Sequence, residues 1–251
     1  MRKVHSLLIL VGLAIAVTGC HGNGTPDSTA GRGSGAVATS APESSADSDG
    51  RSTDDGGPSA KPKVSPDDTR PVLVCFGDSL TAGLGTDPGQ SYPDYLQTEL
   101  DRLHYHYRVD NEGVSGNTTK DGVARLPDVL ALHPVVAVVE FGGNDGLRGL
   151  PIDDTRANLD EIVGTLKRAG IKVAVAGITL PPDYGPDYIR KFDETYTLVA
   201  KKYQVPMLPF LLKNVYGTPG MMQRDQTHAT AKGNQIVAHN ILPLVLPLLK
   251  K

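Results

Sequence analysis

The chain has 251 residues and a formal net charge of −3, with 25 Lys and Arg against 28 Asp and Glu. A charge balance so close to neutral gives no electrostatic reason to expect a nucleic-acid partner. Its length suits one domain of moderate size preceded by shorter segments.

The first segment has the composition of a secretory signal. Arg2 and Lys3 precede an apolar run over residues 7–17, which is too short to span a bilayer as a helix. The sequence Val-Thr-Gly-Cys that ends at Cys20 resembles the bacterial lipobox, in which the cysteine is diacylated and becomes the first mature residue. A plain signal peptide with an incidental cysteine is the alternative, but the small residue before the cysteine favours lipidation. We therefore interpret residues 1–19 as a lipoprotein signal peptide.

The next segment, residues 20–68, is rich in Gly, Ser, Thr, Ala, Asp and Pro and has almost no large apolar residue. Such a composition predicts a disordered linker, with a mean span of roughly 40 Å for a flexible coil. With the linker, the lipidated Cys20 would hold the protein on a membrane of the bacterial cell envelope, facing outside the cytoplasm. The remaining residues, 69–251, are predicted to form a single catalytic domain.

Apolar strand-like runs alternate with amphipathic helical patterns along this domain, which predicts an α/β fold with a parallel sheet covered on both faces. Cys75 lies within the first apolar run and is expected to be a buried structural thiol. The expected strands are 71–76, 107–111, 135–141, 171–178 and 206–208, and the expected helices are 92–103, 118–132, 155–169, 188–203 and 231–249. The last helix contains two prolines and is too short to span a membrane.

Polar motifs follow several of these strands. Ser79 lies in Gly-Asp-Ser-Leu after the first strand, Gly113 follows the second, and Asn144 lies in Gly-Gly-Asn-Asp after the third. Asp225 and His228 precede the last helix. Because ligands bind beyond the carboxyl ends of parallel strands, these blocks are expected to meet in one crevice. Gly-Asp-Ser alone is also ordinary turn chemistry, so the first block gains meaning only from the others.

Together the blocks contain the parts of a nucleophilic hydrolase. A serine hydroxyl needs an adjacent base, which His228 would supply for Ser79, and Asp225 would hold the other ring nitrogen of the histidine. An oxyanion hole needs fixed donors. The candidates are the backbone N–H groups of Ser79 and Gly113 and the side-chain amide of Asn144. Paired cysteines and His-x-x-x-His are absent, so no metal site is expected.

The four blocks, in this order, resemble the SGNH (GDSL) hydrolase family. Three stretches are similar to its thioesterase I/lysophospholipase L1-type arylesterases, namely Ala124–Pro127, Gly142–Gly149 and Val205–Phe210. The resemblance implies a flavodoxin-like three-layer sandwich with a five-stranded parallel sheet, hydrolysis of acyl esters and thioesters, and no cofactor. One position departs from the pattern: Ala229 stands where the family often has proline. Proline there shapes the loop without taking part in the chemistry, so the triad assignment is unaffected.

The leading hypothesis is therefore a monomeric, lipid-anchored serine esterase that acts on small acyl esters, and possible substrates include thioesters and lysophospholipids. A carbohydrate O-deacetylase could use the same triad, and a short acyl pocket would favour it over a lipid esterase. The loop at 180–188 is a candidate wall of that pocket. A third hypothesis, from another class, is a catalytically silent binding lipoprotein.

Overall fold

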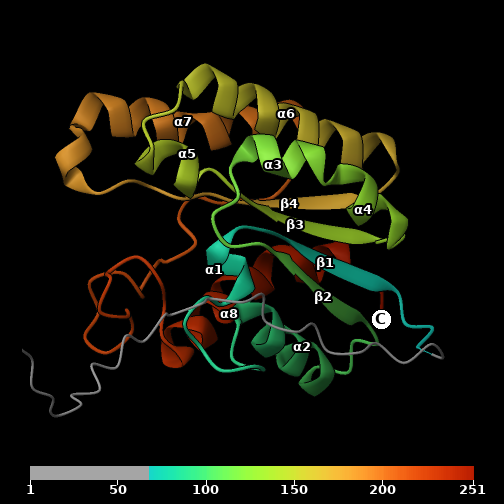
Figure 1. The fold of residues 1–251 in the computed structure, drawn as a ribbon. Helices are drawn as coiled ribbons and strands as arrows, with labels where there is room; N and C mark the ends of the chain where they lie inside the picture. The colour runs from blue at the N-terminus through green and yellow to red at the C-terminus, as the bar shows by residue number, and fades with distance from the viewer. Residues whose placement is uncertain (1–67) are drawn as a thin grey trace, which may run out of the picture. The chain divides into compact units, whose positions relative to one another are not determined.

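The structure is a computed structural model that describes residues 68–251 (Figure 1). The predictions for residues 1–67, including Cys20, lie outside the described residues. Five parallel strands form one sheet in the order β2-β1-β3-β4-β5. The strands are β1 (Val72–Gly77), β2 (Arg108–Gly113), β3 (Val136–Glu140), β4 (Lys172–Ala176) and β5 (Met207–Leu208). This is the flavodoxin-like strand order, so the predicted fold class is confirmed.

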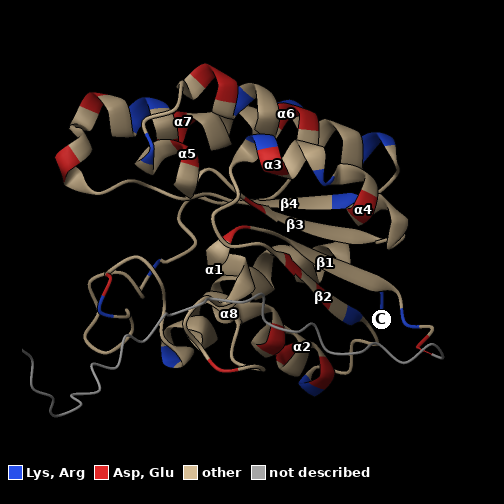
Figure 2. Ribbon diagram, viewed as in Figure 1, with Lys and Arg blue, Asp and Glu red and all other residues tan. Residues whose placement is uncertain are grey.

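Helices cover both faces of the sheet and make the three layers visible in Figure 1. One layer contains α1 (Ser79–Ala82), α2 (Tyr92–Arg102) and α8 (Ala231–Val245). The other contains α3 (Thr119–Ala124), α4 (Leu126–Ala131), α5 (Gly143–Leu147), α6 (Ile152–Arg168) and α7 (Pro186–Tyr203). Short 3₁₀ turns lie at Pro182–Tyr184 and Leu246–Leu248. Acidic and basic residues are mixed along these helices (Figure 2).

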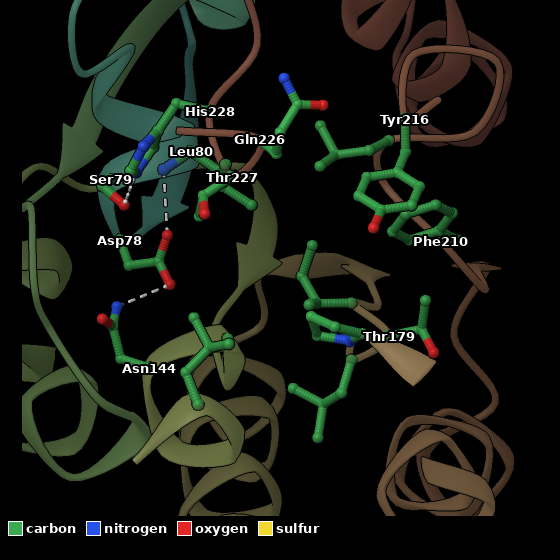
Figure 3. Close-up of a pocket in the computed structure, with 16 residues that line it drawn as sticks. Asp78, Ser79, Leu80, Asn144, Thr179, Phe210, Tyr216, Gln226, Thr227 and His228 are labelled. Carbon is green, nitrogen blue, oxygen red and sulfur yellow. Dashed lines mark hydrogen bonds between the residues drawn. The ribbon is translucent and has the colours of Figure 1, made fainter. Parts of the chain in front are cut away.

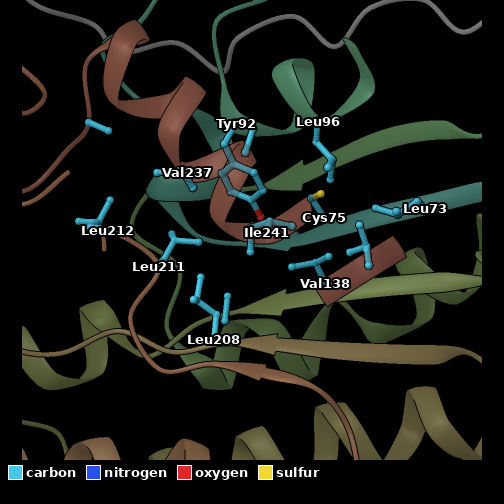
Figure 4. Packing of buried hydrophobic residues seen from close by; sticks show 14 of the residues in the cluster. Leu73, Cys75, Tyr92, Leu96, Val138, Leu208, Leu211, Leu212, Val237 and Ile241 are labelled. Atoms are coloured by element: carbon cyan, nitrogen blue, oxygen red, sulfur yellow. The ribbon is translucent and has the colours of Figure 1, made fainter. Parts of the chain in front are cut away.

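The central strands β1 and β3 are apolar except for Glu140, the last residue of β3, because both faces of the sheet are covered. Every residue of β1 and β3 is buried. Alternate residues of β1 therefore point into different cores: Leu73 and Cys75 pack under α2 and α8 (Figure 4), whereas Val74 and Phe76 pack under α6 and α7. Cys75 is fully buried, and this burial raises the pKa of its thiol. Its predicted structural role agrees with this environment.

The helices differ from the sequence prediction mainly at prolines. The single helix expected over 118–132 is divided into α3 and α4 at Arg125. Pro127, within the first turn of α4, has no N–H for the hydrogen bond that would continue α3. The last helix ends at Val245 rather than 249, and a 3₁₀ turn containing Pro247 follows it. Within residues 68–251, no helix combines the length and apolar character that crossing a bilayer requires.

The strand order determines where a site can form. The chain leaves β1 for β2 on one side of the sheet and later returns to β3 on the other side of β1. The loops that follow β1 and β3 therefore diverge, and a crevice opens between them at the carboxyl edge of the sheet. The residues after these strands begin with Asp78 and Phe141, and the predicted polar blocks follow each.

Candidate active site

Ser79 is held at the end of β1 by a short helix. Asp78 is the N-cap of α1, and its Oδ1 accepts a hydrogen bond from the Leu80 N–H at 3.0 Å. Gly77 precedes it where β1 approaches the side chain of Glu140, and a Cβ at this position would lie 2.6 Å from Glu140 Oε2. Only glycine fits this approach, and the following turn leaves Ser79 as the first residue of α1.

A continuous chain of hydrogen bonds joins Ser79, His228 and Asp225. The Ser79 Oγ lies 2.8 Å from His228 Nε2, and His228 Nδ1 lies 2.7 Å from Asp225 Oδ2. Asp225 Oδ1 also accepts from the backbone N–H groups of Thr227, at 2.9 Å, and His228, at 3.0 Å. Burial alone would raise the pKa of Asp225, but the hydrogen bonds from His228 and Thr227 outweigh it and lower the pKa. The carboxylate is therefore ionised when it faces the imidazole.

The loop carrying His228 is attached to the Ser79 loop by Gln223, a residue that sequence reasoning missed. The Gln223 N–H donates to the His228 carbonyl at 2.8 Å. Its side-chain Nε2 donates to the carbonyls of Leu84, at 2.7 Å, and Ala229, at 2.8 Å. Because Leu84 follows α1, one amide joins the two loops. No sequence signal marked Gln223, since its partners are backbone atoms 139 and 6 residues away along the chain.

The predicted Asn144 lies in α5, beside Asp78. Its Nδ2 donates to Asp78 Oδ2 at 3.1 Å and to the Asn117 carbonyl at 2.9 Å (Figure 3 shows the first bond). Both amide hydrogens are therefore engaged in the free protein. An oxyanion forming at Ser79 would share or replace one of these acceptors.

The prediction that Gly113 offers a free backbone N–H is wrong. That N–H donates to Asn111 Oδ1 at 2.9 Å. Gly113 instead allows α1 to pack closely against β2, because a Cβ here would lie 2.1 Å from the Ala82 nitrogen. Farther along the same loop, Gly116 uses its carbonyl to accept from Arg148 Nη2 at 2.9 Å. The N–H groups of Ser79 and Gly116 donate to no acceptor within residues 68–251.

Two buried carboxyl groups lie directly behind Ser79. Asp78 is 2% exposed and Glu140, the last residue of β3, is 0% exposed. Burial raises the pKa of Asp78 to about 6. Burial and the neighbouring Asp78 charge raise the pKa of Glu140 well above its usual range. Sequence reasoning missed Glu140 because it is an acid within an apolar run, with no motif around it.

A largely apolar pocket of about 240 Å³ opens at the Ser79–His228 pair (Figure 3). Leu180 and Pro181 line it, so the loop predicted to wall the pocket does so at its beginning. The aromatic residues Phe210 and Tyr216, which follow β5, were not predicted to take part. The other lining residues are Asp78, Leu80, Gly143, Asn144, Leu147, Ile178, Thr179, Leu212, Gln226 and Thr227.

In the part of the chain that the structure describes, no three His, Cys, Asp or Glu side chains gather as metal ligands would. A serine, histidine and aspartate in series at the carboxyl edge of a parallel sheet, next to an apolar pocket, form the arrangement of a serine hydrolase.

Comparison with known proteins assigns the family. Residues 75–236 match the GDSL-like Lipase/Acylhydrolase family, to which this chain belongs. It is therefore a serine ester hydrolase. The match spans all four predicted blocks, from the strand before Ser79 to the helix after His228.

Named relatives are similar over most of the domain. Esterase TesA of Pseudomonas aeruginosa is 41% identical over 179 residues, covering 71% of this chain and 89% of the relative. Thioesterase 1/protease 1/lysophospholipase L1 of Escherichia coli is 35% identical, covering 70% of this chain and 84% of the relative. A crystal structure of TesA superimposes with a TM-score of 0.69 at 41% identity, covering 71% of this chain and 99% of that structure.

Proposed function

We propose that Ser79 forms the acyl-enzyme. Its Oγ attacks the ester carbonyl while His228 Nε2 takes the hydroxyl proton, and Asp225 holds the imidazole in the required tautomer. The same proton then passes from His228 to the departing alkoxide, leaving an acyl-Ser79 ester that a water molecule hydrolyses with His228 again as base. The observation that supports this most directly is the Ser79–His228–Asp225 chain, with contacts of 2.8 and 2.7 Å at the mouth of the pocket.

The oxyanion hole in this proposal consists of the Ser79 N–H, the Asn144 amide and the Gly116 N–H. The first and third have no acceptor within residues 68–251, and Asn144 donates to the carbonyl of Asn117, the residue after Gly116. Free backbone donors can bind the charge that develops on the substrate oxygen. Gly113 has no part in this proposal, because its N–H is occupied.

The substrates we propose are carboxylic esters with an apolar acyl chain longer than acetyl. The pocket beside Ser79 is lined by Leu147, Ile178, Leu180 and Phe210, among others, which suits a hydrocarbon chain. Thioesters and lysophospholipids present the same acyl carbonyl, and the relatives named esterase, thioesterase and lysophospholipase support extending the proposal to them.

Deacetylation of carbohydrates is the weaker candidate. An acetyl-xylooligosaccharide esterase from Geobacillus has the same fold, with a TM-score of 0.59, but at 22% identity this likeness concerns the fold alone. An acetyl group would leave most of a 240 Å³ apolar cavity unused. The pocket therefore favours the longer acyl chain.

A series of p-nitrophenyl esters tests the acyl specificity. We expect kcat/KM to rise from acetate to a medium-chain ester by up to about fourfold per buried methylene, because each one contributes ~0.8 kcal/mol. The Ser79→Ala protein provides the blank for uncatalysed and contaminating hydrolysis. A preference for acetate over every longer ester would instead support the deacetylase.

We also propose that Cys20 anchors the enzyme to a membrane, which rests on the lipobox-like sequence before it. Two acyl chains on one cysteine are sufficient for stable membrane association. Five of the large apolar residues that are more than a third exposed lie in the loops at the pocket edge of the sheet or at the end of α5, which suits substrates in a lipid surface. These residues are Leu84, Val114, Leu147, Leu150 and Tyr216.

Replacement of the lipidation site tests the anchor. Wild-type protein is expected to label with palmitate and to partition into the detergent phase, and Cys20→Ser protein should do neither. Both should hydrolyse a water-soluble ester equally, because Ser79 and the pocket lie within residues 68–251. Palmitate labelling of Cys20→Ser protein would show that another residue carries the lipid.

A further inference from the structure

Glu140 is a buried acid that the hydrolytic mechanism above leaves unused. The sheet register pairs it with Gly77 on β1, directly before Asp78. Its Oε2 accepts from Thr81 Oγ1 at 2.8 Å and from the Asp78 N–H at 3.4 Å. Thr81 Oγ1 in turn lies 3.2 Å from the hydroxyl of Tyr92. Glu140 thus contacts both the residue before the nucleophile and the first turn of α1.

The carboxyl groups of Asp78 and Glu140 are both buried, and the Asp78 N–H donates to Glu140 Oε2 at 3.4 Å. Two adjacent buried carboxylates would repel each other, so one of the two groups carries a proton. Glu140 Oε1 is fully buried and accepts no hydrogen bond. A proton on this atom would make it a hydrogen-bond donor, and Asp78 is the neighbouring acid.

The surroundings decide which acid holds the proton. Asp78 accepts from the Leu80 N–H at 3.0 Å and the Asn144 amide at 3.1 Å, and it faces His228, all of which stabilise its charged form. The other titratable groups that face Glu140 are the phenols of Tyr92 and Tyr196. Burial raises the pKa of both phenols well above 10, so neither supplies charge. The proton therefore belongs on Glu140.

We propose that Glu140 is a positioning residue: as a neutral carboxylic acid it donates to the Asp78 carboxylate and fixes it where Asp78 orients the Asn144 amide toward the substrate carbonyl. This inference deepens the proposed function and rests on Asn144 being an oxyanion donor. Without the Glu140 donor, the Asp78 carboxylate would lose a partner in an environment that excludes water. Asn144 would then be left with the Asn117 carbonyl as its one fixed acceptor.

A pair of substitutions separates this role from packing. Glu140→Gln keeps the size, the neutral charge and an N–H donor, so kcat should stay within about threefold of wild type. Glu140→Leu removes the donor, and kcat should fall roughly 10- to 100-fold with little change in KM, because a hydrogen bond to a charged group is lost. A Glu140→Gln protein that folds but is as slow as Glu140→Leu would overturn the proposal.

The pH dependence of thermal stability tests the protonation state independently of catalysis. Wild-type Glu140 must keep its proton in the folded state, whereas the unfolded side chain ionises above about 4.5. Folding of wild type therefore becomes less favourable as pH rises above that value, and the Glu140→Gln protein is spared this loss. The melting temperature of Glu140→Gln minus that of wild type should increase between about pH 5 and pH 8. A difference that stays constant would show that Glu140 is ionised when folded.

A double-mutant cycle tests whether Glu140 acts through Asn144. In an Asn144→Ala background, Glu140→Leu should lower kcat much less than it does in wild type, since the group to be oriented is already gone. Fully additive effects would overturn the assigned route. The Ser79→Ala variant separates failure of the proposed function from failure of this inference. If Ser79→Ala protein remains active, the proposed function fails. If Ser79→Ala protein is inactive but the Glu140 and Asn144 effects are additive, only the role assigned to Glu140 fails.

Discussion

Ser79→Ala is expected to lower kcat by about 10⁴-fold or more while the protein still folds. The substitution removes the atom that forms the acyl bond, and the remaining oxyanion donors and pocket can supply only residual catalysis. Ser79 Oγ makes its side-chain hydrogen bond to His228 alone, so its loss leaves the packing of α1 intact. Steady-state hydrolysis of a medium-chain ester measures the effect.

Thermal unfolding provides the control for that experiment, with a melting temperature close to wild type expected. A fluorophosphonate probe gives a second reading, because it should label wild type and leave Ser79→Ala unlabelled. This labelling also distinguishes the hydrolase from a silent binding protein. Folded Ser79→Ala protein that keeps most of its activity would end the acyl-enzyme mechanism.

The sheet could be predicted from the sequence because strands buried on both faces are continuous apolar runs. β1 and β3 are buried at every position, so their sequences are continuous apolar runs that end abruptly at polar residues. β5 has only two residues, Met207–Leu208, and it was predicted as a strand over residues 206–208. The division of 118–132 into two helices was missed, since its apolar periodicity continues across Pro127 while the backbone hydrogen bonding does not.

Within the site, the residues that could be predicted are those whose partners are local or whose chemistry is rare. Asp225 and His228 are three residues apart in one loop, and Ser79 follows a strand. Gly113 was assigned wrongly because the sequence around a glycine at the end of a strand does not reveal whether its N–H is free. Its acceptor, Asn111 Oδ1, becomes evident only in the folded structure.

The acids behind Ser79 and the walls of the pocket lay beyond sequence reasoning for a related reason. Glu140 contacts Thr81 and Asp78, which are 59 and 62 residues away in the chain. These contacts, and not the residues next to Glu140 in the sequence, indicate its role. Phe210 and Tyr216 are ordinary aromatic residues until the loop after β5 brings them opposite the triad (Figure 3).

Replacement of His228 and of Asp225 should have unequal effects, although both belong to one hydrogen-bonded unit. His228→Ala is expected to lower kcat about as much as the loss of Ser79, because among residues 68–251 only His228 hydrogen bonds to the Ser79 hydroxyl. Asp225→Asn should retain more activity. Its side chain is 47% exposed, so water partly screens its charge and can replace some of its contacts. The asparagine can still accept from the N–H groups of Thr227 and His228, so the loop should keep its shape.

The pH profile of kcat/KM of the wild-type protein tests whether His228 is the general base. The hydrogen bonds from His228 and Thr227 lower the pKa of Asp225, so this carboxylate stays ionised as the solution becomes acidic. Activity should therefore fall on acidification, because a protonated imidazole cannot accept the proton of Ser79 and because Asp78, whose pKa burial raises to about 6, is also protonated there. The kcat/KM of wild type is expected to fall as the pH is lowered towards 4. Circular dichroism over the same pH range checks that the protein remains folded. A profile that stays flat down to about pH 4 would exclude His228 as the general base, because an imidazole is fully protonated there.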